Sequence, residues 1–328
     1  MQPLSWQEQL AQAIRTPNEL LEYVGLMADS IGYSEQAIAQ FSVRVPRVFA
    51  DRIQHKDPDD PILRQVFPYL DEESNNAAFI NDPLAESNTQ PIPGLLQKYN
   101  SRVLSITTGA CAVHCRYCFR RHFPYQNSSS ISKHWQKSIE YIQSDPGIKE
   151  VILSGGDPLS LSDRRLLEMC QALSQIEHVK RIRFHTRIPV VLPSRLSEKL
   201  VKELSLTGKT IIFVLHINHA NEIDSSVINN IKLLKQFNIL VLNQSVLLKG
   251  INDTTQTLIE LSERLVENQV VPYYLHLMDP VAGAAHFNVT EEQAKKLIGN
   301  MHERVSGYLV PKLVKEEIGG KSKTIISK

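Results

Sequence analysis

Three cysteines that lie close together in the chain are the residues best suited to chemistry. Cys111, Cys115 and Cys118 fall within eight positions directly after an apolar stretch, whereas Cys170, the fourth cysteine, lies alone in a helical pattern. Cysteine thiolates are the usual ligands of iron–sulfur clusters, and a short loop with three of them leaves the fourth iron of a cubane without a protein ligand. The spacing therefore predicts a [4Fe-4S] cluster with one reactive iron.

A structural zinc site and a disulfide are the alternatives for these thiols. Tetrahedral zinc usually needs a second Cys-x-x-Cys pair or paired histidines, and the chain has no second cysteine pair. An uneven set of cysteines without a secretory signal is typical of a reducing compartment, where such spacing indicates metal binding or catalysis. Neither alternative explains the triad as well as a cluster does.

Composition argues against several classes of partner. The 328 residues contain 36 Lys and Arg against 35 Asp and Glu, a formal net charge of +1, so no broad field attracts nucleic acid or an anionic membrane. The first residues lack the basic start and apolar segment of a signal peptide, and no run approaches the roughly twenty apolar residues of a membrane span. We expect a cytoplasmic protein that binds neither nucleic acid nor a membrane.

Alternating strand and helix patterns must position the cysteine loop. Apolar residues at helical spacing predict an N-terminal helical layer over residues 6–40, and a Pro-, Asp- and Asn-rich wrap follows over 44–97. After it, strands are predicted at 103–108, 151–153, 181–186, 210–216, 240–247 and 270–277, and helices at 133–144, 163–175, 194–205, 225–236, 254–268 and 290–305.

Six strand-then-helix units require a parallel sheet, because each helix returns the chain to the same end of the sheet. Six are too few for a closed eight-stranded barrel, so we expect an α/β fold with a partial (β/α)6 barrel at 98–305. An N-terminal helical extension at 1–97 would cover its open side, and a C-terminal segment would follow at 306–328. A doubly wound open sheet uses the same units and is the alternative. In both folds chemistry belongs at the carboxyl ends of the strands, where the cysteine loop follows the first strand.

The cysteine loop resembles that of a known enzyme family. Cys-x-x-x-Cys-x-x-Cys is similar to the signature of radical S-adenosylmethionine (SAM) enzymes, and residues 115–125, CRYCFRRHFPY, resemble the lysine 2,3-aminomutase family. More narrowly, they resemble the branch that makes β-lysine for elongation factor P, and the similarity extends from Arg44 to Lys323. The resemblance implies a radical SAM partial barrel that converts (S)-α-lysine to (R)-β-lysine. It also implies a functional link to elongation factor P and its lysine ligase, and an electron donor.

The family's cofactors would be a [4Fe-4S] cluster, S-adenosylmethionine and pyridoxal 5′-phosphate. The resemblance assigns Cys111, Cys115 and Cys118 to the cluster, whose fourth iron would chelate the amino and carboxylate groups of S-adenosylmethionine. It assigns Ser154, Gly155, Gly156 and Asp157 to the amino group of S-adenosylmethionine, and His216 and Gln244 to its nucleoside.

Each of these strand-end residues also has a structural interpretation. Paired glycines fit a tight turn equally well, and Asp157 then favours a turn and capping role over that of a catalytic acid. Polar groups at strand ends, such as His216 and Gln244, are often hydrogen-bonded without binding a ligand. His219 is a weaker candidate than His216, and the two histidines with Glu222 do not have the spacing of a metal site.

The substrate and pyridoxal phosphate residues also follow from the resemblance. Arg120 matches the clamp for the substrate α-carboxylate, for which a planar guanidinium is suited, and Asp279 matches a substrate-side aspartate. An Asp-Pro turn is the alternative for Asp279. Arg116 and Arg102 could serve the pyridoxal phosphate side, and surface ion pairs are the alternative for both.

Lys323 matches the lysine that forms the internal aldimine with pyridoxal phosphate, because it follows Gly319-Gly320 and precedes Thr324. The chain continues Ile325-Ile326 where the branch usually has Pro-Leu, and the spacing from the glycines is one residue shorter. Lys321 is therefore the second candidate. The same shift leaves open whether Glu316 or Glu317 occupies the acidic position before the glycines.

Two other functions remain open on the sequence. A catabolic lysine aminomutase or a glutamate aminomutase would carry the same cluster, and an iron–sulfur scaffold or redox sensor would bind it without turnover.

Overall fold

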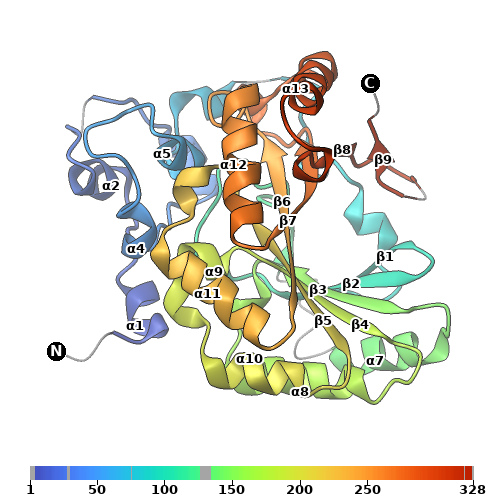
Figure 1. The fold of residues 1–328 in the computed structure, drawn as a ribbon. Helices are drawn as coiled ribbons and strands as arrows, with labels where there is room; N and C mark the ends of the chain where they lie inside the picture. Colours follow the sequence, from blue (N-terminus) through green and yellow to red (C-terminus); the bar gives the residue numbers. More distant parts are fainter. Residues whose placement is uncertain (1–3, 28–29, 75, 126–133, 321, 327–328) are drawn as a thin grey trace.

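A sheet whose strands follow one another in chain order organises the molecule (Figure 1). This computed structural model describes residues 4–27, 30–74, 76–125, 134–320 and 322–326. Within them the strands are β1 (Leu95–Tyr99), β2 (Arg102–Thr108), β3 (Glu150–Gly155), β4 (Arg181–Thr186), β5 (Thr210–His216), β6 (Leu240–Leu247), β7 (Val271–Leu277), β8 (Lys312–Lys315) and β9 (Thr324–Ile325). Strands β2 to β8 are parallel, and β1 and β9 pair antiparallel at the two edges.

The six predicted strand-then-helix units are confirmed. Their helices are α7 (Trp135–Ser144), α8 (Asp163–Ser174), α10 (Glu198–Ser205), α11 (Ser225–Gln236), α12 (Thr255–Glu267) and α13 (Glu291–Arg304). The third helix begins four residues later than predicted, because Pro193–Arg195 forms a 3-10 turn and Ser197 caps α10. The sequence pattern did not predict β1, β8 or β9, which are short edge elements.

The strand order excludes the doubly wound alternative. In a doubly wound sheet the order reverses at a switch point, which places helices on both faces. Here every strand lies beside its predecessor, and α8, α10, α11 and α12 cover one side of the sheet (Figure 1). The fold is therefore the expected partial barrel, and within the described ranges no crossover helix covers its other face.

Strand alternation gives the two faces different side chains. Phe184 on β4 and Phe213 on β5 are register partners, fully buried and stacked at 4.9 Å between ring centroids, in the core shared with α8 and α11. Neighbouring positions such as Arg183, His185 and His216 point to the opposite face, because successive side chains of a strand alternate. The helix-free face is thus the polar face of the sheet.

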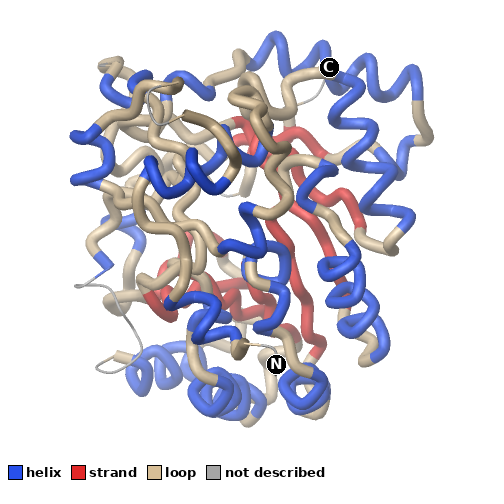
Figure 2. The backbone as a smooth tube through the Cα atoms, turned by 90° about the vertical axis from the view of Figure 1, so that its left-hand side faces the viewer, coloured by secondary structure: helices blue, strands red, loops and turns tan. Residues whose placement is uncertain are grey.

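The N-terminal layer packs on the loops at the carboxyl ends of the strands. It contains α1 (Trp6–Ala11), α2 (Pro17–Tyr23), α3 (Glu35–Gln40), α4 (Arg47–Ala50) and α5 (Pro61–Val66). Arg52 donates to Asp224 at 2.8 Å, and the backbone of Ile80 pairs with Val281. Figure 2 shows the strands enclosed between long helices and this region of loops and short helices.

The sheet crosses both expected domain boundaries. The boundary expected between residues 97 and 98 falls inside β1, and the segment 306–328 contributes β8 and β9. Among the described residues, no helix has the length and apolar character needed to cross a bilayer.

Candidate active site

A cavity of about 310 Å³ lies on the helix-free face and extends to the loops at the carboxyl ends of the strands. Its walls include the residues that the resemblance assigned to the cluster, to S-adenosylmethionine, to the substrate and to the internal aldimine. These residues are Cys111, Cys115, Cys118, Arg120, Ser154, Gly155, Gly156, Asp157, His216, Gln244, Asp279 and Lys323. Positions more than 200 residues apart in the chain thus share one cavity.

The three cysteines lie in the loop after β2. Burial, together with Cys115, raises the pKa of Cys118 to about 11, and burial also raises the pKa of Cys111. Metal cations would be needed to hold such thiols as thiolates. Among the described residues, no three Cys, His, Asp or Glu side chains converge where a single ion could be held. In a cubane each thiolate binds a different iron and the fourth iron has no protein ligand, so three thiols on one short loop suit a cluster.

The glycine pair after β3 fixes the start of the cysteine loop. Gly155 has φ +118°, and a Cβ on Gly156 would lie 2.4 Å from the carbonyl oxygen of Ala110. The Gly156 amide donates to Thr108 at 2.7 Å, and the Asp157 amide donates to Ala110 at 2.9 Å. Only glycine permits two backbone segments to come this close. The pair is therefore a close-packed turn that also lines the cavity.

Asp157 is a capping residue, as the sequence favoured. Its carboxylate accepts hydrogen bonds from the amides of Leu159, Arg187 and Ile188 and from the hydroxyl of Thr186. Burial raises the pKa of Asp157 to about 6, although these donors oppose the shift. Through these hydrogen bonds Asp157 joins the turn after β3 to the segment after β4.

His216 and His219 differ as the sequence suggested. Burial and the Arg187 charge lower the pKa of His216 to about 3, so its imidazole is neutral. The Tyr117 hydroxyl accepts hydrogen bonds from Arg187 and Asn218, donates to Gln65 Oε1 at 3.3 Å, and lies 2.9 Å from His216 Nε2. His219 caps a short turn by accepting from the Asn221 amide and does not line the cavity.

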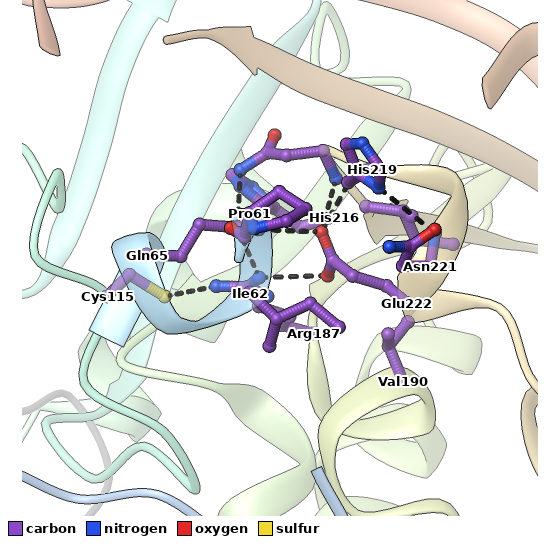
Figure 3. A network of polar contacts seen from close by, with 12 residues as sticks. Pro61, Ile62, Gln65, Cys115, Arg187, Val190, His216, His219, Asn221 and Glu222 are labelled. Atoms are coloured by element: carbon purple, nitrogen blue, oxygen red, sulfur yellow. Dashed lines mark hydrogen bonds and ion pairs between the residues drawn. The ribbon is translucent and has the colours of Figure 1, made fainter. Parts of the chain in front are cut away.

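Arg187 is a residue of this site that sequence reasoning missed (Figure 3). Its Nη1 donates to Cys115 Sγ at 2.8 Å, and its Nη2 donates to Gln65 at 2.6 Å and to Glu222 at 2.9 Å. Burial acts to lower the pKa of Arg187, but its interactions with Cys115, Tyr117 and Glu222 hold it above its usual value. Glu222 is thus the buried partner of a cation and not a metal ligand.

A signal for Arg187 is present in the sequence. Arg183, His185 and Arg187 occupy alternate positions along and just after β4, and all three line the cavity. Parallel strands covered on both faces are mostly apolar, so a cationic alternation indicates that one face lines a polar site.

Arg116 does not serve the cavity, which corrects the expectation that it could serve the pyridoxal phosphate side. It is fully buried, its Nε and Nη2 each donate to Glu72 at 2.7 Å, and its Nη1 donates to the carbonyl of Phe41. Its donors are occupied because it anchors the cysteine loop to the N-terminal layer. Arg102 does line the cavity, and its guanidinium lies 4.0 Å from the ring centroid of Tyr99.

Arg120 lies in the cavity wall with part of its guanidinium occupied. Its Nε and Nη2 donate to Glu86 at 2.7 and 2.8 Å, and its Nη1 lies 3.4 Å from Ser154 Oγ. The Nη1–Nη2 edge therefore remains for a second acceptor. Glu86 fixes the direction in which that edge points.

Lys323 meets Glu316 across the cavity. Lys323 Nζ donates to Glu316 at 2.5 Å, and the Tyr99 hydroxyl donates to the same carboxylate. Burial acts to raise the pKa of Glu316, but Lys323 and these hydrogen bonds hold it below its usual value. Glu317 is exposed and pairs with Lys315, so Glu316 is the acidic residue of the site. Lys321 lies outside the described residues.

Three further groups near Lys323 lack partners. Burial raises the pKa of Asp279 to about 7, against the opposing charge of Lys323. His185 and His276 are buried, which keeps the pKa of each well below its usual value, and within the described part of the chain their Nε2 atoms have no hydrogen-bond partner. All three side chains line the cavity near Lys323, where a ligand could contact them.

Replacing any one of Cys111, Cys115 or Cys118 by Ala should abolish the cluster, because each thiolate binds a separate iron. Iron and sulfide content per chain after anaerobic reconstitution measures this. Cys170→Ala is the matched control. Cys170 is a buried core residue of α8, so its replacement should leave cluster loading intact. Full loading of any triad variant would contradict the assignment.

Known proteins resemble the chain over almost its full length. Residues 105–262 match the Radical SAM superfamily. An L-lysine 2,3-aminomutase of Buchnera aphidicola is 43% identical over 323 residues, which cover 98% of this chain and 95% of that protein. An L-lysine 2,3-aminomutase of Escherichia coli is 44% identical over 320 residues, 97% of this chain and 93% of that protein.

Among solved structures, a radical SAM methyltransferase from Sphaerobacter thermophilus has a TM-score of 0.49 and 13% sequence identity, over 67% of this chain and 68% of that one. By its identity to these relatives and the coverage of both chains, the protein belongs to the L-lysine 2,3-aminomutase family of radical SAM enzymes.

Proposed function

We propose that this protein is an isomerase that converts (S)-α-lysine to (R)-β-lysine. The observation that carries the proposal is the single cavity in which the cysteine triad, Arg120, Asp279 and Lys323 all present side chains. An intramolecular amino shift needs the radical source, the amino-group carrier and the substrate within reach of one another. The family membership supports the same reaction.

The cofactors divide the cavity between them. When bound, the cluster with S-adenosylmethionine supplies a 5′-deoxyadenosyl radical, and pyridoxal phosphate carries the migrating amino group. We assign the cluster to the three cysteines and S-adenosylmethionine to the strand ends at Ser154–Asp157, His216 and Gln244. The neutral imidazole of His216 suits an uncharged nucleoside better than a cation would.

Lys323 is the proposed attachment point of pyridoxal phosphate. The cations Lys98, Arg102 and Arg183 line the same cavity and could neutralise a phosphate. Arg183 pairs with Glu150 through Nη2, while its buried Nε has no partner in the described part of the chain. Glu316 would hold the Lys323 ammonium whenever the lysine is not bonded to the cofactor.

The charges of the cavity favour lysine over glutamate. We assign the substrate α-carboxylate to the free Nη1–Nη2 edge of Arg120 and its distal ammonium to Asp279. A glutamate side chain would instead bring a second carboxylate near Asp279 and Glu316, and like charges in a buried site repel strongly.

We further propose that the β-lysine serves the modification of elongation factor P, with a lysine ligase as the next enzyme. The resemblance of residues 115–125 to that branch supports this further proposal. The enzyme would act in the cytoplasm, where the thiols stay reduced, with an external one-electron donor.

The decisive assay incubates reconstituted enzyme, S-adenosylmethionine, pyridoxal phosphate and a reductant with isotopically labelled lysine or glutamate. We expect labelled β-lysine and 5′-deoxyadenosine from lysine and no product from glutamate. Turnover of glutamate would make the chain a glutamate aminomutase. Absence of 5′-deoxyadenosine from a fully loaded enzyme would favour the scaffold or sensor.

Borohydride reduction of the holoenzyme should fix pyridoxal phosphate covalently on Lys323, since that amine lies in the cavity. Peptide mapping identifies the lysine that carries the added mass. Lys312→Ala, a substitution on β8, is the matched control, and in this variant the label should remain on Lys323. Label on Lys321 would show that the shorter glycine spacing shifts the attachment point.

Lysine should bind about tenfold more tightly at pH 8 than at pH 6 if Asp279 receives the ammonium, because its carboxyl group titrates at about 7 and attracts a cation only when ionised. The dissociation constant of lysine for the holoenzyme, measured by calorimetry without reductant, gives this profile. Asp279→Asn should bind weakly and without this pH dependence. An unchanged profile in that variant would place the ammonium elsewhere.

A further inference from the structure

Arg187 contacts a cluster cysteine, and three other segments of the chain hold its guanidinium in place. It follows β4, and its guanidinium reaches Cys115 Sγ and the Tyr117 hydroxyl, both at 2.8 Å, through one nitrogen. The other terminal nitrogen is held by Gln65 from α5 and by Glu222 after β5 (Figure 3). A group with so many fixed partners has little freedom to turn away from the sulfur.

The three cysteines differ in the side chains that contact their sulfur atoms. Within the described part of the chain, a charged side chain donates a hydrogen bond to the sulfur of Cys115 but not to that of Cys111 or Cys118. Arg44 reaches only the backbone carbonyl of Cys111, at 2.9 Å. The contact is therefore specific to one corner of the expected cluster.

The Arg187–Glu222 pair is oriented toward the cluster. The Glu222 carboxylate contacts Arg187 Nη2, while Arg187 Nη1 faces the Cys115 sulfur. The side chains of Arg187 and Glu222 are both almost fully buried. In such buried surroundings, solvent screens the interaction between the positive guanidinium and the Cys115 sulfur only weakly. A hydrogen bond to a cluster sulfur strengthens as negative charge accumulates on the cluster, and such bonds are one of the factors that set cluster potentials.

We propose that Arg187 is a positioning residue that raises the reduction potential of the cluster through Cys115. The oxidised cluster accepts one electron from an external low-potential one-electron donor, and no bond or proton is exchanged in that step. By favouring the reduced form, Arg187 lets a weaker donor carry out the reduction. This inference rests on the cluster of the proposed function, and it concerns the potential, not the amino shift.

The test is a redox titration of reconstituted holoenzyme, followed by the electron paramagnetic resonance signal of the reduced cluster. At the wild-type midpoint, Arg187→Gln should lower the ratio of reduced to oxidised cluster about tenfold, which is ~59 mV for one electron. Arg187→Lys keeps the charge without the planar fork and should give a smaller shift of the same sign. Arg195→Gln is the control, because Arg195 is equally buried but donates to the carbonyls of Leu159 and Leu161 and should leave the midpoint unchanged.

Iron and sulfide content, measured first, separates this inference from the proposed function. Wild-type protein without a cluster would overturn the proposed function itself. A loaded Arg187→Gln or Arg187→Lys that titrates at the wild-type midpoint would overturn the inference alone. Failure of both variants to load, with Arg195→Gln loaded, would also overturn it, because Arg187 would then act in cluster assembly.

Discussion

The confinement of all crossover helices to one face of the sheet is the constraint on which the rest of the structure depends. Because β2 to β7 follow in chain order, the helices cover one face, and every second strand residue is left pointing away from them. Phe184 and Phe213 fill the helix-facing side, while Arg183, His185 and His216 line the cavity. One set of strands thereby supplies both the hydrophobic core and the polar site.

Buried arginine–glutamate pairs bind the cysteine loop to the remainder of the chain. Arg116 and Arg120, both in or beside this loop, pair with Glu72 and Glu86 of the N-terminal layer. Removing one partner of a buried pair leaves an uncompensated charge and typically costs about 3–5 kcal/mol. The N-terminal layer is therefore part of the site, since it holds the loop that carries the cluster ligands.

Charges in the cavity are paired at some positions and unpaired at others. Lys323 and Arg120 have carboxylate partners, which orient both side chains before a ligand enters. The Asp279 carboxylate has no hydrogen bond or ion pair among the described residues, and burial raises its pKa to about 7. A cation placed beside Asp279 would offset the free-energy cost of ionising this buried carboxyl group. This is a physical reason for the cavity to select a substrate with a distal ammonium.

The sequence determined the β/α alternation and the cysteine triad, because periodicity and spacing are local properties. It could not choose between a partial barrel and a doubly wound sheet, since both use the same local units and differ only in strand order. It also could not show that Arg116 is occupied by Glu72, that Glu316 rather than Glu317 meets Lys323, or that Arg187 reaches Cys115. Each of these contacts joins residues from different elements, and the direction of a buried side chain is decided by the charge that tertiary packing places next to it.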